Sequence, residues 1–186
     1  MPEKFMKQAL KEAQKAYDKE EIPVGAVIVK DGKIIARAHN QKETKNDTTK
    51  HAEILAIQKA SQKLGAWRLE ECEMYITLEP CTMCMGAIIN ARIKKIYIGT
   101  PDPKTGACGS FIDLTQHKYN HIVEIEKGIL QLECEYILKD FFRELRKKKK
   151  NRNQWNNHNS SNTNHNSSYN AIKIQCRRRN RYALCS

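Results

Sequence analysis

Short β-rich runs alternate with amphipathic helical stretches along residues 1–146, and this order limits the possible folds more than any other feature. The runs VGAVIVK and KIIARAHN flank Asp31-Gly32, a two-residue turn signal that joins antiparallel strands. EMYITLE, KKIYIG and HIVEIEKG are three further strand-like runs. The order predicts a three-layer α/β fold, in which a central mixed sheet of about five strands carries helices on both faces.

Helical spacing of apolar residues predicts four helices, one of them at the N-terminus, where an apolar stripe begins at Phe5. A second helix is predicted after the polar loop at residues 40–49, with Thr48 or Thr49 as its N-cap and Gly65 at its end. A third follows Pro80. The fourth is predicted over residues 129–146.

The positive charge of the chain lies mostly at its C-terminal end. The 33 Lys and Arg residues outnumber the 21 Asp and Glu residues, which gives a net charge of +12. Ten of the basic residues lie in the segment 147–186, which has no acidic residue, whereas residues 1–146 carry 23 basic and 21 acidic residues. The strong basicity therefore says little about the folded part.

The segment 147–186 is rich in Asn and Ser and poor in apolar residues, so it cannot bury enough surface to offset its ordering entropy. We therefore expect a folded domain at residues 1–146 and a basic, disordered Asn/Ser-rich tail at residues 147–186. The run KKKK at the boundary raises the alternative hypothesis that part of the tail is a frameshift artefact. An intact mass of the native protein that matches the full chain would refute that hypothesis.

The seven cysteines are an odd number for a disulfide framework and are unevenly spread, which favours a reducing compartment. No stretch approaches the ~20 apolar residues that span a bilayer. The N-terminus also lacks the apolar core of a signal peptide. The sequence predicts a cytoplasmic protein without a membrane partner.

The stretch EPCTMCMGA places Cys81 and Cys84 on one face of the first turn of a helix, where the helix dipole favours thiolates. A C-x-x-C pair alone fits zinc binding and thiol–disulfide exchange equally well. The remaining cysteines of the folded part, Cys72, Cys108 and Cys134, are isolated and are predicted to be core thiols.

The stretch TKHAEILAI adds His51 and Glu53 in the first turn of the second predicted helix. Taken alone, the histidine fits a packing or capping role and the glutamate a favourable interaction with the helix dipole. Taken with the two cysteines, His51 completes three ligands with a fourth position open, which is the pattern of catalytic zinc. Glu53 would then act as a base for the metal-bound water.

HAE followed by PCTMC matches the H-x-E…P-C-x-x-C signature of zinc-dependent nucleobase deaminases. EIPVGAVIV, YITLEPCTMCMGAII, DPKTGACGS and DFFRELR extend the likeness from about Phe5 to Arg146. Together they resemble the bacterial tRNA-specific adenosine deaminases, of the cytidine/deoxycytidylate deaminase superfamily. The resemblance implies a cytidine-deaminase-like fold and hydrolytic deamination of the wobble adenosine to inosine in a tRNA anticodon, with an arginine tRNA as substrate. It also implies one Zn²⁺ per subunit, zinc-activated water, a Glu53 proton shuttle and a homodimer that shares the tRNA anticodon stem-loop.

Further substrate-binding residues follow from the resemblance. Asn40 matches an asparagine that hydrogen-bonds the flipped base, and Asp102 an aspartate near the sugar-phosphate; both also fit simple turn residues. The remaining candidates for RNA contact are Lys104 and Thr105 in the loop of Asp102, and Phe142, Arg143 and Arg146 on the closing helix. That helix also fits a core stripe with a basic end, and we expect one of its two adjacent phenylalanines in the core.

Three other functions fit part of the same pattern. A guanine, cytosine or free-nucleoside deaminase would use the same zinc ligands, although the DPKTGACGS loop and the basic closing helix favour tRNA. A non-catalytic, zinc-containing RNA-binding partner subunit would have no need of Glu53. A thiol–disulfide oxidoreductase would leave HAE unexplained.

Overall fold

The structure, a computed structural model, describes residues 2–161, with side chains as far as residue 154. Of the described residues, 2–141 form one compact unit and 142–161 belong to a second. The described part of the second unit is the continuation of a helix to Ser161. Within residues 2–161, no helix combines the length and the apolar character that crossing a membrane requires.

Five strands form one mixed sheet in the order β2-β1-β3-β4-β5. The strands are β1 (Gly25–Lys30), β2 (Lys33–His39), β3 (Cys72–Leu78), β4 (Lys95–Thr100) and β5 (Glu124–Lys127). β1 pairs antiparallel with β2 and β3, whereas β3, β4 and β5 run parallel. The β1–β2 hairpin turns at Asp31 and Gly32, whose φ angles of 49° and 70° fit a two-residue turn. The predicted turn and five-stranded mixed sheet are confirmed.

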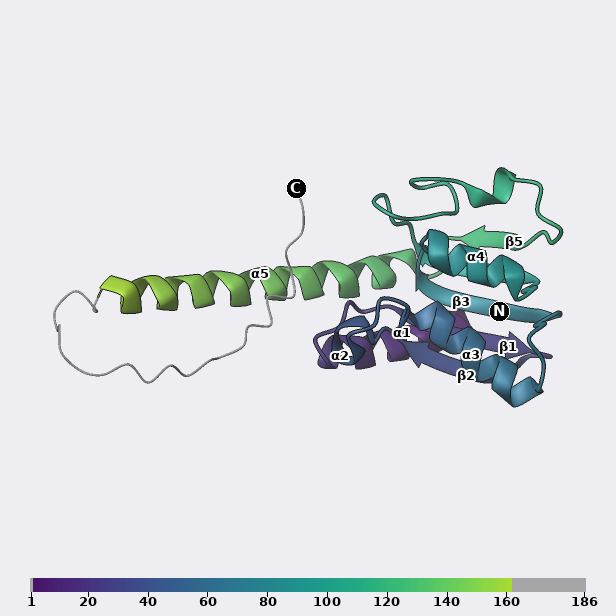
Figure 1. Cartoon of the computed structure of the whole chain (residues 1–186), viewed down its shortest axis with the longest axis horizontal. Coiled ribbons are helices and arrows are strands. Elements are labelled where there is room, and N and C mark those ends of the chain that lie inside the picture. The colour runs from purple at the N-terminus through teal and green to yellow at the C-terminus, as the bar shows by residue number, and fades with distance from the viewer. Residues whose placement is uncertain (1, 162–186) are drawn as a thin grey trace. The chain divides into compact units, whose positions relative to one another are not determined.

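Helices cover both faces of this sheet, as Figure 1 shows. α1 (Pro2–Asp18) covers one face, and α3 (Ala52–Leu64) and α4 (Thr82–Asn90) cover the other. Alternate residues of β1 divide between the two cores: Val27 and Val29 lie in the α1 core, and Ala26 and Ile28 in the α3/α4 core. This period of two follows from the pleat of a strand that is buried on both faces. The predicted three layers are confirmed.

The last helix, α5 (Gln131–Ser161), starts on the α1 face, because its Cys134 belongs to the α1 core. The contact is close: a Cβ on Gly99 of β4 would lie 2.4 Å from the Cys134 sulfur. α5 continues past the predicted end at Arg146. The prediction of disorder is therefore corrected for residues 147–161, which contain no Gly or Pro to end a helix. The division at 146/147 stays a prediction, and residues 162–186 lie outside the described residues.

Two segments differ from the prediction near the start of α3. A short helix, α2 (Lys42–Lys45), lies within the predicted loop at residues 40–49. The N-cap of α3 is His51, in place of Thr48 or Thr49. The predicted end of α3 is confirmed, because Gly65 adopts the left-handed conformation with φ 65°.

Candidate active site

Three side chains predicted to bind a metal lie together at the start of α3 and α4. The Nδ1 atom of His51 is 3.8 Å from the Cys81 sulfur and 3.5 Å from the Cys84 sulfur. Their ligand atoms all lie within 4.8 Å of one another. Zinc–sulfur bonds of about 2.3 Å and a zinc–nitrogen bond of about 2.0–2.1 Å at tetrahedral angles separate sulfur from nitrogen by about 3.6 Å. The spacing therefore fits a tetrahedral zinc ion.

The local backbone explains why these side chains meet. His51 is the N-cap of α3, and Cys81 is the N-cap of α4. Both have extended backbone conformations, and neither side chain makes a capping hydrogen bond to its own helix. Cys84 lies in the first turn of α4 and is fully buried. Two adjacent helix N-termini thus present three ligands to one point.

Hydrogen bonds within this group prepare it for a cation. The bond to Cys84 is the largest of several contacts that lower the pKa of the Cys81 thiol to about 4, so Cys81 is a thiolate at neutral pH. The bond to Cys81 raises the pKa of His51. The Cys81 thiolate thus accepts hydrogen bonds from the Cys84 thiol and the His51 imidazole. A divalent cation bound at the same point could replace the protons of these hydrogen bonds.

Glu53 lies beside this group and is buried, with 4% of its surface exposed. Burial raises the pKa of its carboxyl group, while the Cys84 thiol acts in the opposite direction through a hydrogen bond. A buried carboxyl group with a raised pKa next to a metal site suits proton transfer near neutral pH. Its position thus matches the predicted role, which remains a prediction.

Asn40 follows β2 and is also buried, with 5% exposed. Its Nδ2 group donates a hydrogen bond to Glu21 over 3.2 Å. The next residue pairs with the segment that leads to His51, because the backbone N–H of Gln41 donates to the carbonyl of Lys50. Asn40 is therefore held near the α3 N-terminus, with its amide orientation set by Glu21. Sequence reasoning missed Glu21, whose partners lie about twenty residues away.

The loop at residues 101–113 carries Asp102, Lys104 and Thr105. The Asp102 carboxylate accepts hydrogen bonds from the Lys104 backbone N–H at 2.9 Å and the Thr105 hydroxyl at 2.5 Å. Asp102 thus acts as a turn residue within its own loop, which was one of its two predicted roles. Lys104 and Thr105 are exposed. Contacts of all three with RNA remain predictions.

Glu79 is a second buried carboxylate that sequence reasoning missed, although it stands two residues before Cys81. Only 2% of its surface is exposed. It accepts hydrogen bonds from the backbone N–H groups of Asp102, Cys108 and Ser110, and from the Ser110 hydroxyl. Its four donors all belong to the 101–113 loop. Because these donors lie in a separate loop, local spacing in the sequence does not predict their hydrogen bonds to Glu79.

The phenylalanine predicted to lie in the core is Phe141, which is 5% exposed and makes an edge-on contact with the Tyr17 ring at 5.4 Å. Phe142, Arg143 and Arg146 belong to the second unit. Within that unit the Arg143 guanidinium lies 3.7 Å from the Glu144 carboxylate. Their contact with RNA stays a prediction.

The isolated cysteines Cys72, Cys108 and Cys134 are free and buried, as predicted for core thiols. They lie in the two hydrophobic cores and outside the His51–Cys81–Cys84 group.

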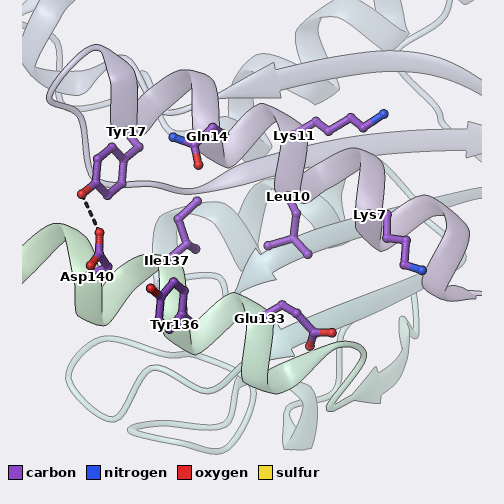
Figure 2. A pocket seen from close by; sticks show the side chains of 9 residues that line it. All are labelled: Lys7, Leu10, Lys11, Gln14, Tyr17, Glu133, Tyr136, Ile137 and Asp140. Atoms are coloured by element: carbon purple, nitrogen blue, oxygen red, sulfur yellow. Dashed lines mark hydrogen bonds between the residues drawn. The ribbon is translucent and has the colours of Figure 1, made fainter.

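A separate cavity of about 620 Å³ lies between α1 and α5, and Figure 2 shows the side chains that line it. The Tyr17 hydroxyl donates to Asp140 at one end over 2.7 Å. The other lining residues are Lys7, Leu10, Lys11, Gln14, Glu133, Tyr136 and Ile137. This lining contains neither His nor Cys, so the cavity lacks the ligand chemistry of the His51–Cys81–Cys84 group.

Comparison with known proteins defines the class of this protein. The model of the MafB19-like deaminase family matches residues 2–146, so the chain belongs to that family. Within this class, a tRNA-specific adenosine deaminase of Bacillus subtilis (strain 168) is 51% identical over 149 residues, covering 80% of this chain and 92% of the relative. The resemblance to the bacterial tRNA-specific adenosine deaminases is confirmed.

Two solved structures extend the comparison. One, from biochemical and structural studies of A-to-I editing by tRNA:A34 deaminases, matches with a TM-score of 0.67 and 45% identity, covering 73% of this chain and 99% of that chain. A guanine deaminase from Bacillus subtilis matches with a TM-score of 0.51 and 37% identity, covering 63% of this chain and 86% of that chain. The predicted cytidine-deaminase-like α/β fold is confirmed.

Proposed function

We propose that this protein hydrolyses the wobble adenosine of a tRNA anticodon to inosine and releases ammonia. The observation that carries the proposal is the convergence of His51, Cys81 and Cys84 beside buried Glu53, in a chain 51% identical to a tRNA-specific adenosine deaminase. The match to a structure from studies of tRNA:A34 deaminases supports the same substrate.

The metal we propose is Zn²⁺, with one ion per subunit held by His51, Cys81 and Cys84. Two cysteines and a histidine, with a fourth position left to solvent, are a donor set typical of catalytic zinc. When bound, zinc supplies Lewis-acid activation of a water molecule at neutral pH.

Glu53 moves the protons in this proposal. The reaction forms a bond between the water oxygen and C6 of adenine and breaks the bond between C6 and the exocyclic nitrogen. The Glu53 carboxylate takes a proton from the water and delivers it to the adjacent ring nitrogen. It then transfers the second water proton to the leaving amine, which departs as ammonia. Burial, which raises the pKa of Glu53, favours a carboxyl group that both accepts and returns a proton.

Substrate binding is assigned to the two segments next to the metal ligands and to α5. The carboxamide of Asn40 reads the base edge, and Asp102, with Lys104 and Thr105, lies at the sugar-phosphate backbone. Phe142, Arg143 and Arg146 hold the anticodon stem-loop through stacking and phosphate contacts. Each assignment follows from the resemblance and remains a proposal.

The proposed setting is a cytoplasmic homodimer that edits an arginine tRNA. Residues 1–146 carry a net charge of only +2, so RNA must bind at local clusters of basic residues. Because phosphate contacts release counterions, we expect affinity for RNA to fall steeply between low and moderate salt. An affinity that is flat over this range would contradict phosphate-based binding.

The test is an editing assay with the zinc-loaded protein and an arginine anticodon stem-loop that carries adenosine at the wobble position. The matched control RNA moves this adenosine to the neighbouring anticodon position, and free adenosine, guanine and cytosine are assayed in parallel. Inosine in the first RNA alone is the expected result. Ammonia from guanine or cytosine, without inosine in RNA, would support the small-molecule alternative, for which the guanine deaminase likeness is the reason.

A further inference from the structure

The Glu79 carboxylate lies where the end of β3, the metal ligands and the 101–113 loop meet. Its oxygen Oε1 accepts from the backbone N–H groups of Cys108 at 2.8 Å and Ser110 at 3.2 Å. Its oxygen Oε2 accepts from the Asp102 N–H at 3.2 Å and from the Ser110 hydroxyl. All four donors are neutral N–H or O–H groups. Both carboxylate oxygens are therefore committed to one loop.

The same loop runs directly against the metal-ligand segment. Gly106 forms an antiparallel bridge with Cys81, and the Ala107 N–H donates to the Pro80 carbonyl over 2.9 Å. The fit around Gly106 is tight, because a Cβ there would lie 2.6 Å from both the Glu79 carboxyl carbon and the Asp102 carbonyl oxygen. The loop that bears Asp102 is thus fixed between Glu79 and the Cys81 segment.

A carboxylate suits this position because it accepts at both oxygens. A glutamine of the same shape would turn its NH₂ group either toward the Asp102 N–H or toward the N–H groups of Cys108 and Ser110, whereas the Ser110 hydroxyl could rotate to accept from it. At least one contact with a backbone N–H would then change from attraction to repulsion without any change in volume. The chemistry of the four contacts is therefore matched to Glu and poorly matched to Gln.

We propose that Glu79 is a positioning residue, which holds the 101–113 loop so that Asp102, Lys104 and Thr105 meet the target nucleotide. This proposal deepens the proposed function and rests on it for the identity of the substrate. Glu79 touches neither the metal nor the substrate in this role. It acts through the loop.

The test is Glu79→Gln in the full-length, zinc-loaded enzyme. We expect KM for the anticodon stem-loop to rise about 10- to 100-fold, while kcat changes much less. An effect of this size is typical when a residue that orients metal-binding side chains is replaced, and we expect the same of a residue that orients a substrate-binding loop. Zinc content should equal that of the wild type. Hydrogen exchange of the amides at residues 102–110 should become faster, while exchange elsewhere in residues 1–141 stays unchanged.

A second variant keeps the proposal testable if Glu79→Gln folds poorly. Ser110→Ala removes one of the four donors and should raise KM about threefold, the effect of one hydrogen bond. The matched control is Asp113→Asn. Its carboxylate also accepts from a backbone N–H and a hydroxyl, both of Thr115, but it makes no such contact with residues 102–110. KM should then change by less than about twofold.

Two results would overturn the proposal. One is a folded Glu79→Gln enzyme with the KM of the wild type. Glu79 would then contribute to stability alone. The other is loss of zinc, which would place its effect on the metal ligands. Failure of the proposed function looks different: the wild type itself would form no inosine. In that case, localised fast exchange at residues 102–110 would still support the role of Glu79 in holding the loop, and unchanged exchange would overturn it.

Discussion

The two faces of the sheet use buried titratable groups in different ways. On the α3/α4 face, His51, Cys81 and Cys84 converge with Glu53, and their ligand atoms face one another at two helix N-termini. On the α1 face, buried His39 donates from Nδ1 to Glu12 at 3.1 Å, while its Nε2 accepts from Lys19 at 3.1 Å.

The two groups differ in the kind of partner: His39 pairs with the carboxylate of Glu12, whereas His51, Cys81 and Cys84 hydrogen-bond to one another. Glu12 also pairs with Lys15 over 2.7 Å, so Glu12, Lys15 and His39 form one connected group of hydrogen bonds. The lining of the cavity between α1 and α5 contains neither His nor Cys (Figure 2). We therefore expect the α1 face to contribute stability, whereas the His51–Cys81–Cys84 group of the α3/α4 face could hold a metal ion. Substitutions on the two faces should separate activity from stability.

The largest effect is expected from His51→Ala on the α3/α4 face. Loss of one of three ligands should lower the zinc content from about one ion per chain toward zero. Editing should fall by roughly 10⁴-fold or more, as when a member of a catalytic unit is removed. Metal analysis and the inosine assay measure both effects. Full zinc content in this variant would show that the three side chains are not the ligand set.

The next effect concerns Met6, which is fully buried in the α1 core. Met6→Ala should lower the free energy of unfolding by about 2–5 kcal/mol, because it leaves a cavity. The rate per folded molecule should stay at the wild-type value. Lys7→Ala, on the exposed side of the same helix, is the control and should change stability by less than about 0.5 kcal/mol. A lowered kcat in folded Met6→Ala would contradict the claim that the α1 face contributes to stability and not to activity.

The smallest effect is a dependence of stability on pH through His39. Burial lowers the pKa of His39 below its ordinary value of 6.5. Below about pH 6.5 the unfolded chain therefore takes up a proton that the folded protein refuses, so the free energy of unfolding falls as pH falls. The lowered pKa of Glu12 adds a loss in the same direction below pH 4.5.

Urea unfolding of the zinc-loaded protein between pH 7.5 and 5 measures this dependence. His39→Gln should flatten the slope, and His117→Gln, at an exposed position, is the matched control. An equal slope in wild type and His39→Gln would show that other groups set the acid sensitivity.

Local sequence patterns identified the groups that need a fixed spacing. Cys81 and Cys84 share one helical turn, and His51 and Glu53 stand two residues apart, so the sequence alone brings each pair together. The sheet also followed from its strand-like runs and the Asp31-Gly32 turn. The predicted N-cap of α3 was wrong, because His51 is the N-cap residue. Sequence statistics favour Ser, Thr, Asp or Asn at this position.

Long-range contacts could not be predicted in this way. Glu21 and Glu79 accept from backbone N–H groups about 20–30 residues away, and every residue except proline carries such a group, so its position cannot be read from the residue type. The end of α5 was missed for another reason. A polar run without Gly or Pro reads as disorder by composition, yet nothing in it stops a helix that is already formed.

The central claim is a division of labour: His51, Cys81 and Cys84 hold the metal, and Glu53 moves the protons. Glu53→Ala tests it most directly, with zinc content and inosine formation measured on the same preparation against the wild type. The account predicts about one zinc ion per chain in both proteins and no inosine from the variant. Loss of zinc in Glu53→Ala would contradict the account, and so would inosine formation at the wild-type rate.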